Sequence, residues 1–365
     1  MKKKILIVVG TRPNFIKVTR FKQLAAEYQN IEIKIIHTGQ HYDTKMADVF
    51  FDQFNLVPDF FLNIQGGSVN TQMAEIMLGL EKVSNDYKPD LIMVVGDVNS
   101  TLAAALTANK LGVKIAHLES GLRSADRTMP EEINRILTDE ITDYFFVTEQ
   151  SGWDNLVKEG KSQEQLFFVG NTMIDTMIAF ESKILSNDVL TRYQLEKDKF
   201  ILMTIHRPAT VDYKDELIKL IELIEVINKT YKIIFPIHPR TINNLKKFNL
   251  YDRINHISNL ILLEPLDYFS FQKLIASCKF IITDSGGIQE ESTFRLKPCI
   301  TLRPNTERPS TVTVGSNILL PFDNHLIMKT IEEINNGEYK KGTIPPLWDG
   351  KSTERILAVL DKLLA

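Results

Sequence analysis

The stretch F-I-I-T-D-S-G-G-I-Q-E-E, residues Phe280–Glu291, sets the fold class of this chain. A β-branched run follows Phe280, and Ser285 with two glycines then precedes a segment rich in helix-forming side chains. This order predicts a strand, a tight turn and the start of a helix, where unpaired backbone N–H groups can bind an anion such as phosphate. An ordinary turn in which Ser285 caps the helix would give the same pattern. The other motifs of the chain favour the phosphate-binding interpretation.

Short apolar runs alternate with longer amphipathic segments along the whole chain, which is typical of parallel sheets covered by helices on both faces. The runs predicted to be strands are Ile5–Val9, Ile33–Ile36, Leu91–Val95, Val113–Ala116, Tyr144–Val147, Leu166–Val169, Phe200–Ile205, Lys232–Phe235, Leu260–Leu263, Phe280–Thr283 and Cys299–Leu302. A polar segment of mixed charge, Glu181–Lys199, lies between the two sets and is interpreted as a helix and surface connection. We predict an α/β protein of two doubly wound Rossmann-like domains, residues 1–175 and 176–352, with the helix 353–365 packing back on the first.

Composition and charge argue against several classes of function. The 365 residues are 44% hydrophobic and 24% charged, as in soluble globular proteins, and the net charge of −3 gives no electrostatic support for nucleic-acid or membrane-surface binding. The only cysteines, Cys278 and Cys299, favour a reducing compartment over a disulfide framework. The apolar run near the start is too short for a signal peptide, and none approaches the roughly 20 residues of a membrane span. We expect a cytoplasmic protein.

Polar residues gather directly after the predicted strands, where open parallel sheets bind their ligands. Four of the seven histidines lie there: His37, His117, His206 and His238. A single histidine after a strand is more often structural than catalytic. Several strand ends that carry Arg, His, Asp or Glu together favour a polar cleft between the two domains.

The first predicted domain offers carboxylates at or near these positions, namely Asp97, Glu119, Glu131 and Glu132. Such groups are suited to acid–base chemistry. Structural alternatives remain open for some of these residues: Asp97 can cap the helix that begins near residue 99, and Glu131 can face the positive end of a helix dipole. Arg12, at another helix start, is placed for a phosphate contact or for a salt bridge.

The second predicted domain offers anion binders, namely His206, Arg308 and the turn at Ser285. Acid–base groups in one domain and phosphate binders in the other suit a phosphorylated substrate. Known cofactor and metal motifs are missing. Gly10-Thr11-Arg12-Pro13-Asn14 follows the first strand in place of G-x-G-x-x-G, and there is no P-loop, nucleophile elbow, H-E-x-x-H or C-x-x-C. If the chain is an enzyme, we therefore expect it to work with side chains alone.

Taken together, the motifs resemble the non-hydrolysing UDP-N-acetylglucosamine 2-epimerases almost from end to end. The matching stretches, in family order, are Gly10–Pro13 with Lys17, His37–Tyr42, Gly96–Asp97, His117–Arg123, Pro130–Arg135, Gly170–Thr172, Thr204–Arg207, Thr283–Glu291 and Thr306–Pro309. The resemblance implies a fold of the glycosyltransferase-B type with an interdomain cleft, a homodimer and no cofactor. It also implies interconversion of UDP-GlcNAc and UDP-ManNAc for envelope or capsule polysaccharides.

The resemblance implies roles for individual residues as well. Asp97, Glu119 and Glu131 match the catalytic acids of the family. The implied contacts to the nucleotide sugar are Arg12, Lys17, Arg135, His206, Leu266, Phe271, Ser285, Gly286, Gly287, Glu291 and Arg308. Among these, Leu266 is expected to contribute main chain to the base and Glu291 to meet the ribose hydroxyls.

The chemistry of a 2-epimerase accounts for these residue types. Carbon-2 of an N-acetylhexosamine is not beside a carbonyl, so simple enolisation cannot remove its proton. In an elimination, a carboxylate takes this proton while UDP leaves carbon-1, and UDP adds again after protonation from the opposite face. This route needs acids on both faces of the sugar, a group of donors that stabilises the diphosphate, and a closed cleft that retains UDP.

The chain also departs from the family pattern. Pro208, Ala209 and Thr210 follow His206-Arg207 where a small or basic residue, Glu and Asn are usual, and Ser310 stands in place of Glu. Activation by a second substrate molecule uses a basic residue at the place of Pro208, so it is not expected here. A 2-epimerase of a decorated UDP-sugar, a glycosyltransferase or hydrolysing epimerase, and a nucleotide-sugar binding protein without activity are the alternatives.

Overall fold

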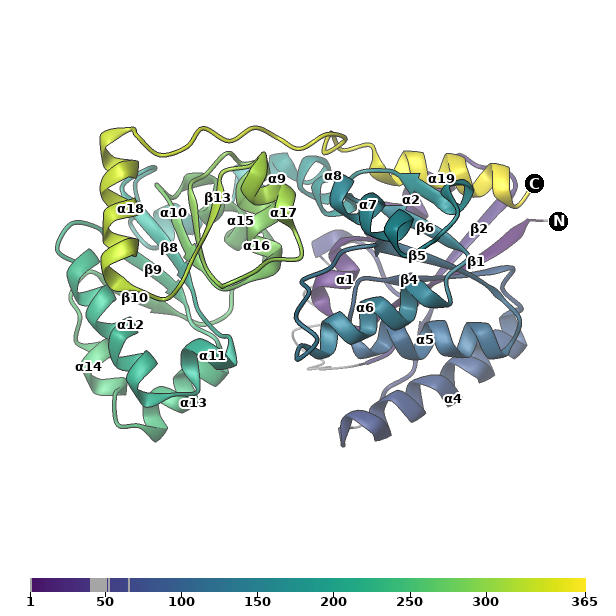
Figure 1. Ribbon diagram of the computed structural model, residues 1–365, viewed down its shortest axis with the longest axis horizontal. Coiled ribbons are helices and arrows are strands. Elements are labelled where there is room, and N and C mark those ends of the chain that lie inside the picture. Colours follow the sequence, from purple (N-terminus) through teal and green to yellow (C-terminus); the bar gives the residue numbers. More distant parts are fainter. Residues whose placement is uncertain (1, 40–50, 52, 65) are drawn as a thin grey trace. The chain divides into compact units, whose positions relative to one another are not determined.

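The computed structural model describes residues 2–39, 51, 53–64 and 66–365, and the chain divides into two compact units (Figure 1). The first unit comprises residues 1–179 and 346–365, and the second comprises residues 180–345. The sequence pattern predicts borders at residues 175 and 352. Three residues of the His37–Tyr42 motif, Gln40, His41 and Tyr42, lie outside the described residues.

The first unit is built on a seven-stranded parallel sheet with the strand order β3-β2-β1-β4-β5-β6-β7. The strands are β1 (Lys3–Val9), β2 (Ile31–His37), β3 (Phe60–Phe61), β4 (Leu91–Val95), β5 (Lys114–Ser120), β6 (Tyr144–Val147) and β7 (Leu166–Phe168). Its helices are α1 (Arg12–Ile16), α2 (Phe21–Ala25), α4 (Val69–Tyr87), α5 (Asn99–Lys110), α6 (Pro130–Glu140), α7 (Gln150–Lys158), α8 (Thr172–Ala179) and α19 (Ser352–Leu363). The strand order reverses between β1 and β4, which is where doubly wound sheets open a crevice for ligands.

Burial explains why the central strands read as continuous apolar runs. All five residues of β4 are buried, because helices cover both faces of a parallel sheet. Helix α5 packs on this strand through small side chains, including Ala104, Ala105 and Ala108, which allow close approach. Helix α19 returns to pack against α2 and α8 (Figure 1). The buried carboxylate of Asp175 accepts backbone N–H groups from the start of α19.

The second unit is built on a six-stranded parallel sheet with the order β10-β9-β8-β11-β12-β13. The strands are β8 (Phe200–Thr204), β9 (Lys232–Pro236), β10 (Leu260–Leu263), β11 (Ile281–Thr283), β12 (Cys299–Leu302) and β13 (Asn317–Leu320). Its helices are α9 (Glu181–Leu185), α10 (Val189–Arg192), α11 (Pro208–Val211), α12 (Lys214–Ile227), α13 (Pro239–Lys247), α14 (Tyr251–Asn255), α15 (Tyr268–Ser277), α16 (Gly286–Phe294), α17 (Pro309–Thr313) and α18 (Asn324–Asn336).

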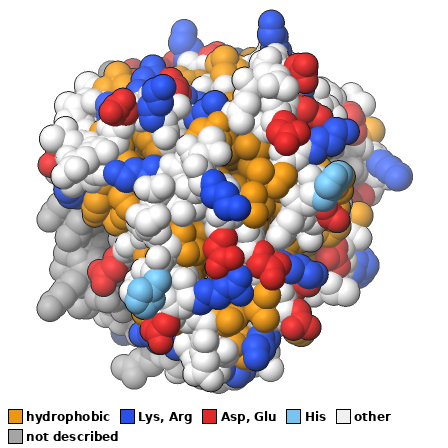
Figure 2. All heavy atoms as spheres, turned by 90° about the vertical axis from the view of Figure 1, so that its left-hand side faces the viewer, with side chains coloured by type: hydrophobic (Ala, Val, Ile, Leu, Met, Phe, Trp, Pro, Cys, Tyr) orange, Lys and Arg blue, Asp and Glu red, His pale blue; other side chains and the backbone are white. Residues whose placement is uncertain are grey.

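Alternate residues along these strands face two separate hydrophobic clusters. Ile201 and Met203 pack with α12, α13, α14 and α18, whereas Leu202 and Phe200 pack with α10, α15 and α16. The period of two places one cluster on each face of the sheet. Figure 2 views the molecule from the side of α12, α14 and α18, and basic and acidic side chains are interspersed on this face.

The predicted fold class, two doubly wound Rossmann-like units, is confirmed. The strand prediction omitted β3 and β13. Strand β3 has only two residues, and β13 begins with the polar Asn317, whose side chain accepts a hydrogen bond from Thr301. No helix among the described residues is long and apolar enough to cross a membrane.

Candidate active site

Asp97 lies in the turn between β4 and α5 and is held by helix α6. Its Oδ2 atom is 2.6 Å from Nη2 of Arg135, and its backbone carbonyl accepts a 2.9 Å hydrogen bond from Nδ2 of Asn134. Asp97 does not cap α5, since the residue at the N-cap is Val98. The side chain of Asp97 is 26% exposed, so its carboxylate is held by Arg135 and is also reachable from solvent.

Glu119 occupies an irregular position near the end of β5. Its backbone has φ +72°, and the pairing of β5 with β6 shifts register there, so the strand bulges and re-aims the side chain. The carboxylate forms an ion pair with Lys17, and both side chains are buried. A Cβ atom at Gly96 would lie 3.5 Å from Lys17 Nζ and 3.7 Å from Glu119 Oε2. Gly96 therefore leaves room for this pair directly beside Asp97.

Glu131 and Arg12 both lie exposed at helix starts. Glu131 is in the first turn of α6, where the helix dipole favours an acid. Its position is therefore compatible with stabilising the helix as well as with a catalytic role. Arg12 is the first residue of α1. The structure brings Asp97, Glu119 and Lys17 together and leaves these two residues at the surface of the first unit.

Glu132, the neighbour of Glu131, is buried; the sequence offers it as a carboxylate of the first domain, but no role was predicted for it. Its carboxylate accepts the backbone N–H groups of Ser124 and Ala125, each at 2.9 Å, and lies 2.6 Å from Nη1 of Arg135. Burial by itself raises the pKa of Glu132, but these hydrogen bonds and the positive charge of Arg135 outweigh burial, so the pKa is lowered. Glu132 therefore fixes the guanidinium that in turn holds Asp97.

His117, which the sequence places after a strand, lies inside β5, is fully buried and is structural in its contacts. Its Nδ1 atom lies 2.6 Å from Oδ1 of Asp139, and its Nε2 atom lies 2.8 Å from the carbonyl oxygen of Gly96. Asp139 also accepts the N–H of Gly121 at 3.0 Å and lies 2.7 Å from Arg123. Burial raises the pKa of Asp139, but His117 and Arg123 outweigh burial and lower it, so the carboxyl group is ionised.

In the second unit, the two-glycine turn leads into α16 as the sequence predicts. Ser285 is the N-cap residue, but its side chain makes no capping hydrogen bond, and its own N–H donates to Oγ1 of Thr283 at 3.0 Å. Gly286 and Gly287 occupy the first helical turn, where N–H groups have no partner within the helix. The N–H of Ser285 is thus used inside the turn, and the glycine N–H groups are the ones placed for an anion.

Arg308 packs directly against this turn. A Cβ atom at Gly286 would lie 2.9 Å from Nη1 of Arg308 and 2.8 Å from Oε1 of Glu307, so only glycine lets the guanidinium approach this closely. Arg308 is buried and pairs with Glu307 and, at 2.9 Å, with Glu290. Two carboxylates thus fix the guanidinium beside the start of α16.

Glu291 lies one turn further into α16 and is buried. Burial, assisted by the neighbouring charge of Glu290, raises the pKa of Glu291 to about 8. The carboxyl group is therefore largely protonated at neutral pH and can donate a hydrogen bond as well as accept one.

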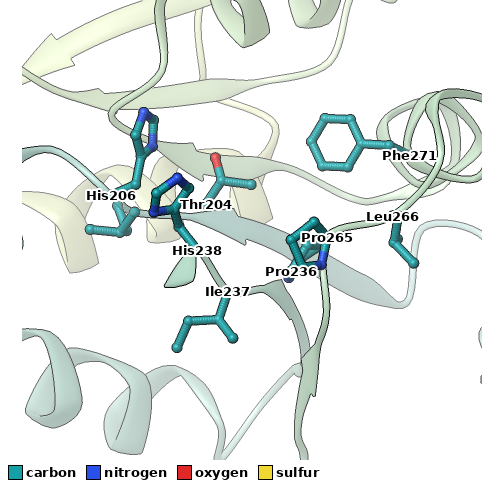
Figure 3. Close-up of a pocket in the computed structure, with 9 residues that line it drawn as sticks. Thr204, His206, Pro236, Ile237, His238, Pro265, Leu266 and Phe271 are labelled. Atoms are coloured by element: carbon teal, nitrogen blue, oxygen red, sulfur yellow. The ribbon is translucent and has the colours of Figure 1, made fainter. Parts of the chain in front are cut away.

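A pocket of about 200 Å³ opens at the ends of β8 and β9 (Figure 3). The His206 and His238 rings lie side by side at one end, with centroids 5.5 Å apart, and Leu266 and Phe271 lie across the pocket from them. The buried Asp284 accepts the backbone N–H of His206 at 2.9 Å, and its Oδ1 lies 2.9 Å from the Nδ1 atom of the same residue. Asp284, which was not predicted as a site residue, thereby sets the orientation of this imidazole.

The pocket has imidazoles at one end and apolar walls elsewhere. Burial lowers the pKa of His238, and the charges of His206 and Arg240 lower it further. Among the residues that the structure describes, no group of three or more His, Cys, Asp or Glu side chains is arranged to hold a metal ion. The chemistry that these residues offer is acid–base chemistry in the first unit and anion binding in the second.

Comparison with known proteins relates the whole chain to one family. A family model described as UDP-N-acetylglucosamine 2-epimerase matches residues 23–361. A UDP-N-acetylglucosamine 2-epimerase of Methanocaldococcus jannaschii is 42% identical over 366 residues, which cover 98% of each chain. A UDP-2,3-diacetamido-2,3-dideoxy-D-glucuronate 2-epimerase of Pseudomonas aeruginosa is 35% identical over 375 residues, which cover 99% of this chain and 100% of that protein.

A solved structure is similar over the same length. It is the M. jannaschii UDP-GlcNAc 2-epimerase in complex with UDP-GlcNAc and UDP, with a TM-score of 0.89 and 40% sequence identity. The match covers 98% of this chain and 99% of that one. The similarity therefore extends over both units.

Proposed function

The chain belongs to the UDP-N-acetylglucosamine 2-epimerase family, and we propose that it interconverts UDP-GlcNAc and UDP-ManNAc by eliminating UDP and adding it again. The observation that carries the proposal is the pair of carboxylates beside Gly96. Asp97 is paired with Arg135, and Glu119 with Lys17. A carboxylate placed beside carbon-2 of the sugar can accept its proton, and the paired cation fixes the position of each carboxylate.

The second unit supports a role in binding the diphosphate. The N–H groups of Gly286 and Gly287 and the positive end of the α16 dipole favour an anion, and Arg308 adds a full charge to them. A guanidinium fixed by Glu290 and Glu307 needs little reorganisation when negative charge develops on the leaving group. His206, oriented by Asp284, is the remaining donor that we assign to the diphosphate.

The pocket between the imidazoles and Phe271 supports a role in binding the base. Its volume of about 200 Å³ is below the roughly 300–1,000 Å³ typical of sites for drug-sized ligands, so it suits one ring of a larger substrate. Phe271 offers an aromatic surface and Leu266 lies beside it, as expected for a planar uracil. Glu291 is assigned to the ribose hydroxyls.

The proposed reaction needs only these side chains. One carboxylate takes the proton from carbon-2, the electrons of the C–H bond form the double bond to carbon-1, and the bond from carbon-1 to the UDP oxygen breaks. The UDP oxygen carries away the electron pair, and 2-acetamidoglucal remains. A protonated acid then returns a proton to the opposite face of carbon-2, and UDP attacks carbon-1. Asp97 and Glu119, with Glu131 as a third group, are assigned to these proton transfers.

The wider role follows the family resemblance. We infer a homodimeric cytoplasmic enzyme that works without metal or redox cofactor and supplies UDP-ManNAc for envelope or capsule polysaccharides. A second candidate is a 2-epimerase of a decorated UDP-sugar. It is favoured by the similarity to the P. aeruginosa enzyme that acts on a diacetamido sugar, which spans the full chain.

One experiment separates these functions. The protein is incubated in deuterated water with UDP-GlcNAc, and in parallel with the UDP-diacetamidoglucuronate, and carbon-2 is followed by NMR. Deuterium at carbon-2 with intact UDP-ManNAc is the expected result. If only the decorated sugar exchanges, that sugar is the substrate and UDP-GlcNAc is not. Free N-acetylmannosamine with stoichiometric UDP would indicate hydrolysis. An unchanged spectrum with both sugars would contradict epimerase activity.

A further inference from the structure

Helix α6 buries polar side chains where a helix on a sheet usually buries apolar ones. Its buried residues are Glu132, Asn134, Arg135, Thr138 and Asp139. Glu132, Arg135 and Asp139 follow the spacing i, i+3, i+7, which places them along one face. Asp139 is the most deeply buried of the three, and its hydrogen bonds reach neither Asp97 nor Glu119. Its contacts are instead the His117 ring, the Arg123 guanidinium and the backbone N–H of Gly121.

We propose that Asp139 is a positioning residue that sets the separation of the two proposed acids, Asp97 and Glu119. This inference rests on the proposed function, because it concerns the same reaction. The residue acts through two connections. One leads through His117 to the turn that carries Asp97, and the other leads through Gly121 to the bulge that carries Glu119.

The first connection ends on the residue before Asp97. Oδ1 of Asp139 lies 2.6 Å from Nδ1 of His117, and Nε2 of His117 lies 2.8 Å from the carbonyl oxygen of Gly96. Gly96 has φ +66°, so its peptide orientation turns the chain out of β4. A carbonyl and an ionised carboxylate are both acceptors, so the two contacts require a hydrogen on each nitrogen of the ring. His117 thereby transmits the position of Asp139 to the peptide that precedes Asp97.

The second connection ends just beyond Glu119. Oδ2 of Asp139 accepts the N–H of Gly121 at 3.0 Å, and Gly121 has φ +79°. A Cβ atom at Gly121 would lie 2.2 Å from the carbonyl oxygen of Gly152, so the chain has no freedom to move in that direction. Glu119 itself has φ +72°, a conformation that a non-glycine residue keeps only when its surroundings enforce it. The carboxylate of Asp139 holds one end of this strained segment.

The chemistry of the site makes an ionised carboxylate necessary. Asp139 accepts hydrogen bonds from the His117 ring, the Gly121 N–H and the Arg123 guanidinium. In Asp139→Asn, one oxygen becomes an NH₂ group, which must face at least one of these donors whichever way the amide is turned. A buried donor is then left without an acceptor, and the surrounding backbone shifts to relieve it. A shift of about 1 Å between reacting groups can lower the rate about 100-fold.

The test compares two buried aspartates of the first unit. Asp175 is also buried. It accepts hydrogen bonds from the N–H groups of Ser352 and Thr353 and from the hydroxyl of Thr353, and these contacts hold α19 in place. Asp139→Asn and Asp175→Asn therefore make the same change of atoms at two buried sites, one of which faces the charged Arg123 and the other neutral donors. For each variant, kcat and KM with UDP-GlcNAc, UDP affinity by calorimetry, and the melting temperature are measured on the full chain.

We expect Asp139→Asn to lower kcat about 100-fold, with KM and UDP affinity within about twofold of the parent, because the proposed UDP contacts that hold the base and the diphosphate lie in the second unit. Asp175→Asn should lower the melting temperature to a similar extent and leave kcat within about twofold. An Asp139→Asn variant with the parent kcat would overturn the proposal. Equal losses of kcat in both variants would overturn it as well, because general destabilisation would then explain them.

Two further measurements cover other outcomes. If Asp139→Asn fails to fold, His117→Gln tests the connection to Gly96. Both N–H donors of glutamine are on one nitrogen, so they cannot span the two acceptors that the ring nitrogens reach, and the same loss of kcat at unchanged KM is expected. If the parent exchanges no hydrogen at carbon-2 of any UDP-sugar, the proposed function has failed. The inference is then judged from a crystal structure of Asp139→Asn, in which both Asp97 and Glu119 must have moved relative to the parent. Unmoved acids would overturn it.

Discussion

Helix α6 of the first unit and helix α16 of the second both support the proposed site, but in different ways. Helix α6 contributes side chains: Arg135 holds Asp97, and Asp139 reaches the flanking backbone through His117. Helix α16 contributes its first turn, where the absence of a side chain at Gly286 admits Arg308. In the proposed reaction, proton transfer depends on a network of paired side chains, whereas anion binding depends on backbone N–H groups and close approach. Substitutions around the two helices should therefore have effects of different size and on different quantities, the rate of exchange for α6 and the affinity for UDP for α16.

The largest effect is expected at Asp97, on the α6 side of the comparison. Asp97→Asn removes the carboxylate but keeps the shape of the side chain, so exchange at carbon-2 should fall about 10²–10⁴-fold while UDP affinity is unchanged. NMR in deuterated water measures the first quantity and calorimetry the second. Asp86→Asn, an exposed change on α4, serves as the control. Exchange at the parent rate would remove Asp97 from the proton transfers.

A smaller effect, of the opposite kind, is expected at His206. His206→Ala removes a donor whose orientation Asp284 fixes, and losing one hydrogen bond to a charged group should weaken UDP binding about 10- to 100-fold. Calorimetric titration with UDP measures the change, and His325→Ala, an exposed histidine of α18, is the matched control. An affinity equal to that of the parent would exclude His206 from the diphosphate site.

Gly286→Ala tests the role of close approach at α16. The added Cβ displaces the ends of the Arg308 and Glu307 side chains, so we expect UDP affinity to fall about tenfold with little change in melting temperature. Gly66→Ala is the control, because a Cβ there meets no atom within 4 Å. Parent affinity in Gly286→Ala would show that the contact of Arg308 with the turn is not needed for binding.

The smallest effect concerns stability and pH at Glu291. Its folded pKa is about 8, against about 4.3 in an unfolded chain, so between these values only the folded state holds the proton and stability decreases as the pH rises. Glu291→Gln removes this decrease. The variant should gain a few degrees in melting temperature relative to the parent at pH 8, and less at pH 5. Exposed Glu332→Gln is the control, and a gain that does not depend on pH would contradict the assignment.

The fold could be predicted from the sequence because buried parallel strands are written as apolar runs. The exceptions are physical: β3 is too short to form a run, and the first residue of β13 is the polar Asn317. Strand β5 runs on to Ser120, beyond the predicted end at Ala116, because a bulge lets the pairing continue past Glu119.

The site was predictable where side chains follow strands and hidden where they lie on a buried helix face. Asp97 and the Ser285 turn come directly after apolar runs, so their position at the carboxyl ends of two strands could be predicted. Glu131 and Glu132 are adjacent and chemically identical, and only the rotation of α6 decides that the second is buried. Apolar periodicity does not reveal a helix whose buried face consists of charged and polar side chains. The spacing of Glu132, Arg135 and Asp139 was the signal that could have found it.

The return of α19 to the first unit bears on how the chain folds during synthesis. The second unit, residues 180–345, is complete before residues 346–365 leave the ribosome, whereas the first unit lacks its last helix until then. Until that moment Asp175 has no Ser352 or Thr353 to bond, and the surfaces of α2 and α8 that α19 covers are open to water or to a chaperone. The unit that is made first is therefore the one that is finished last.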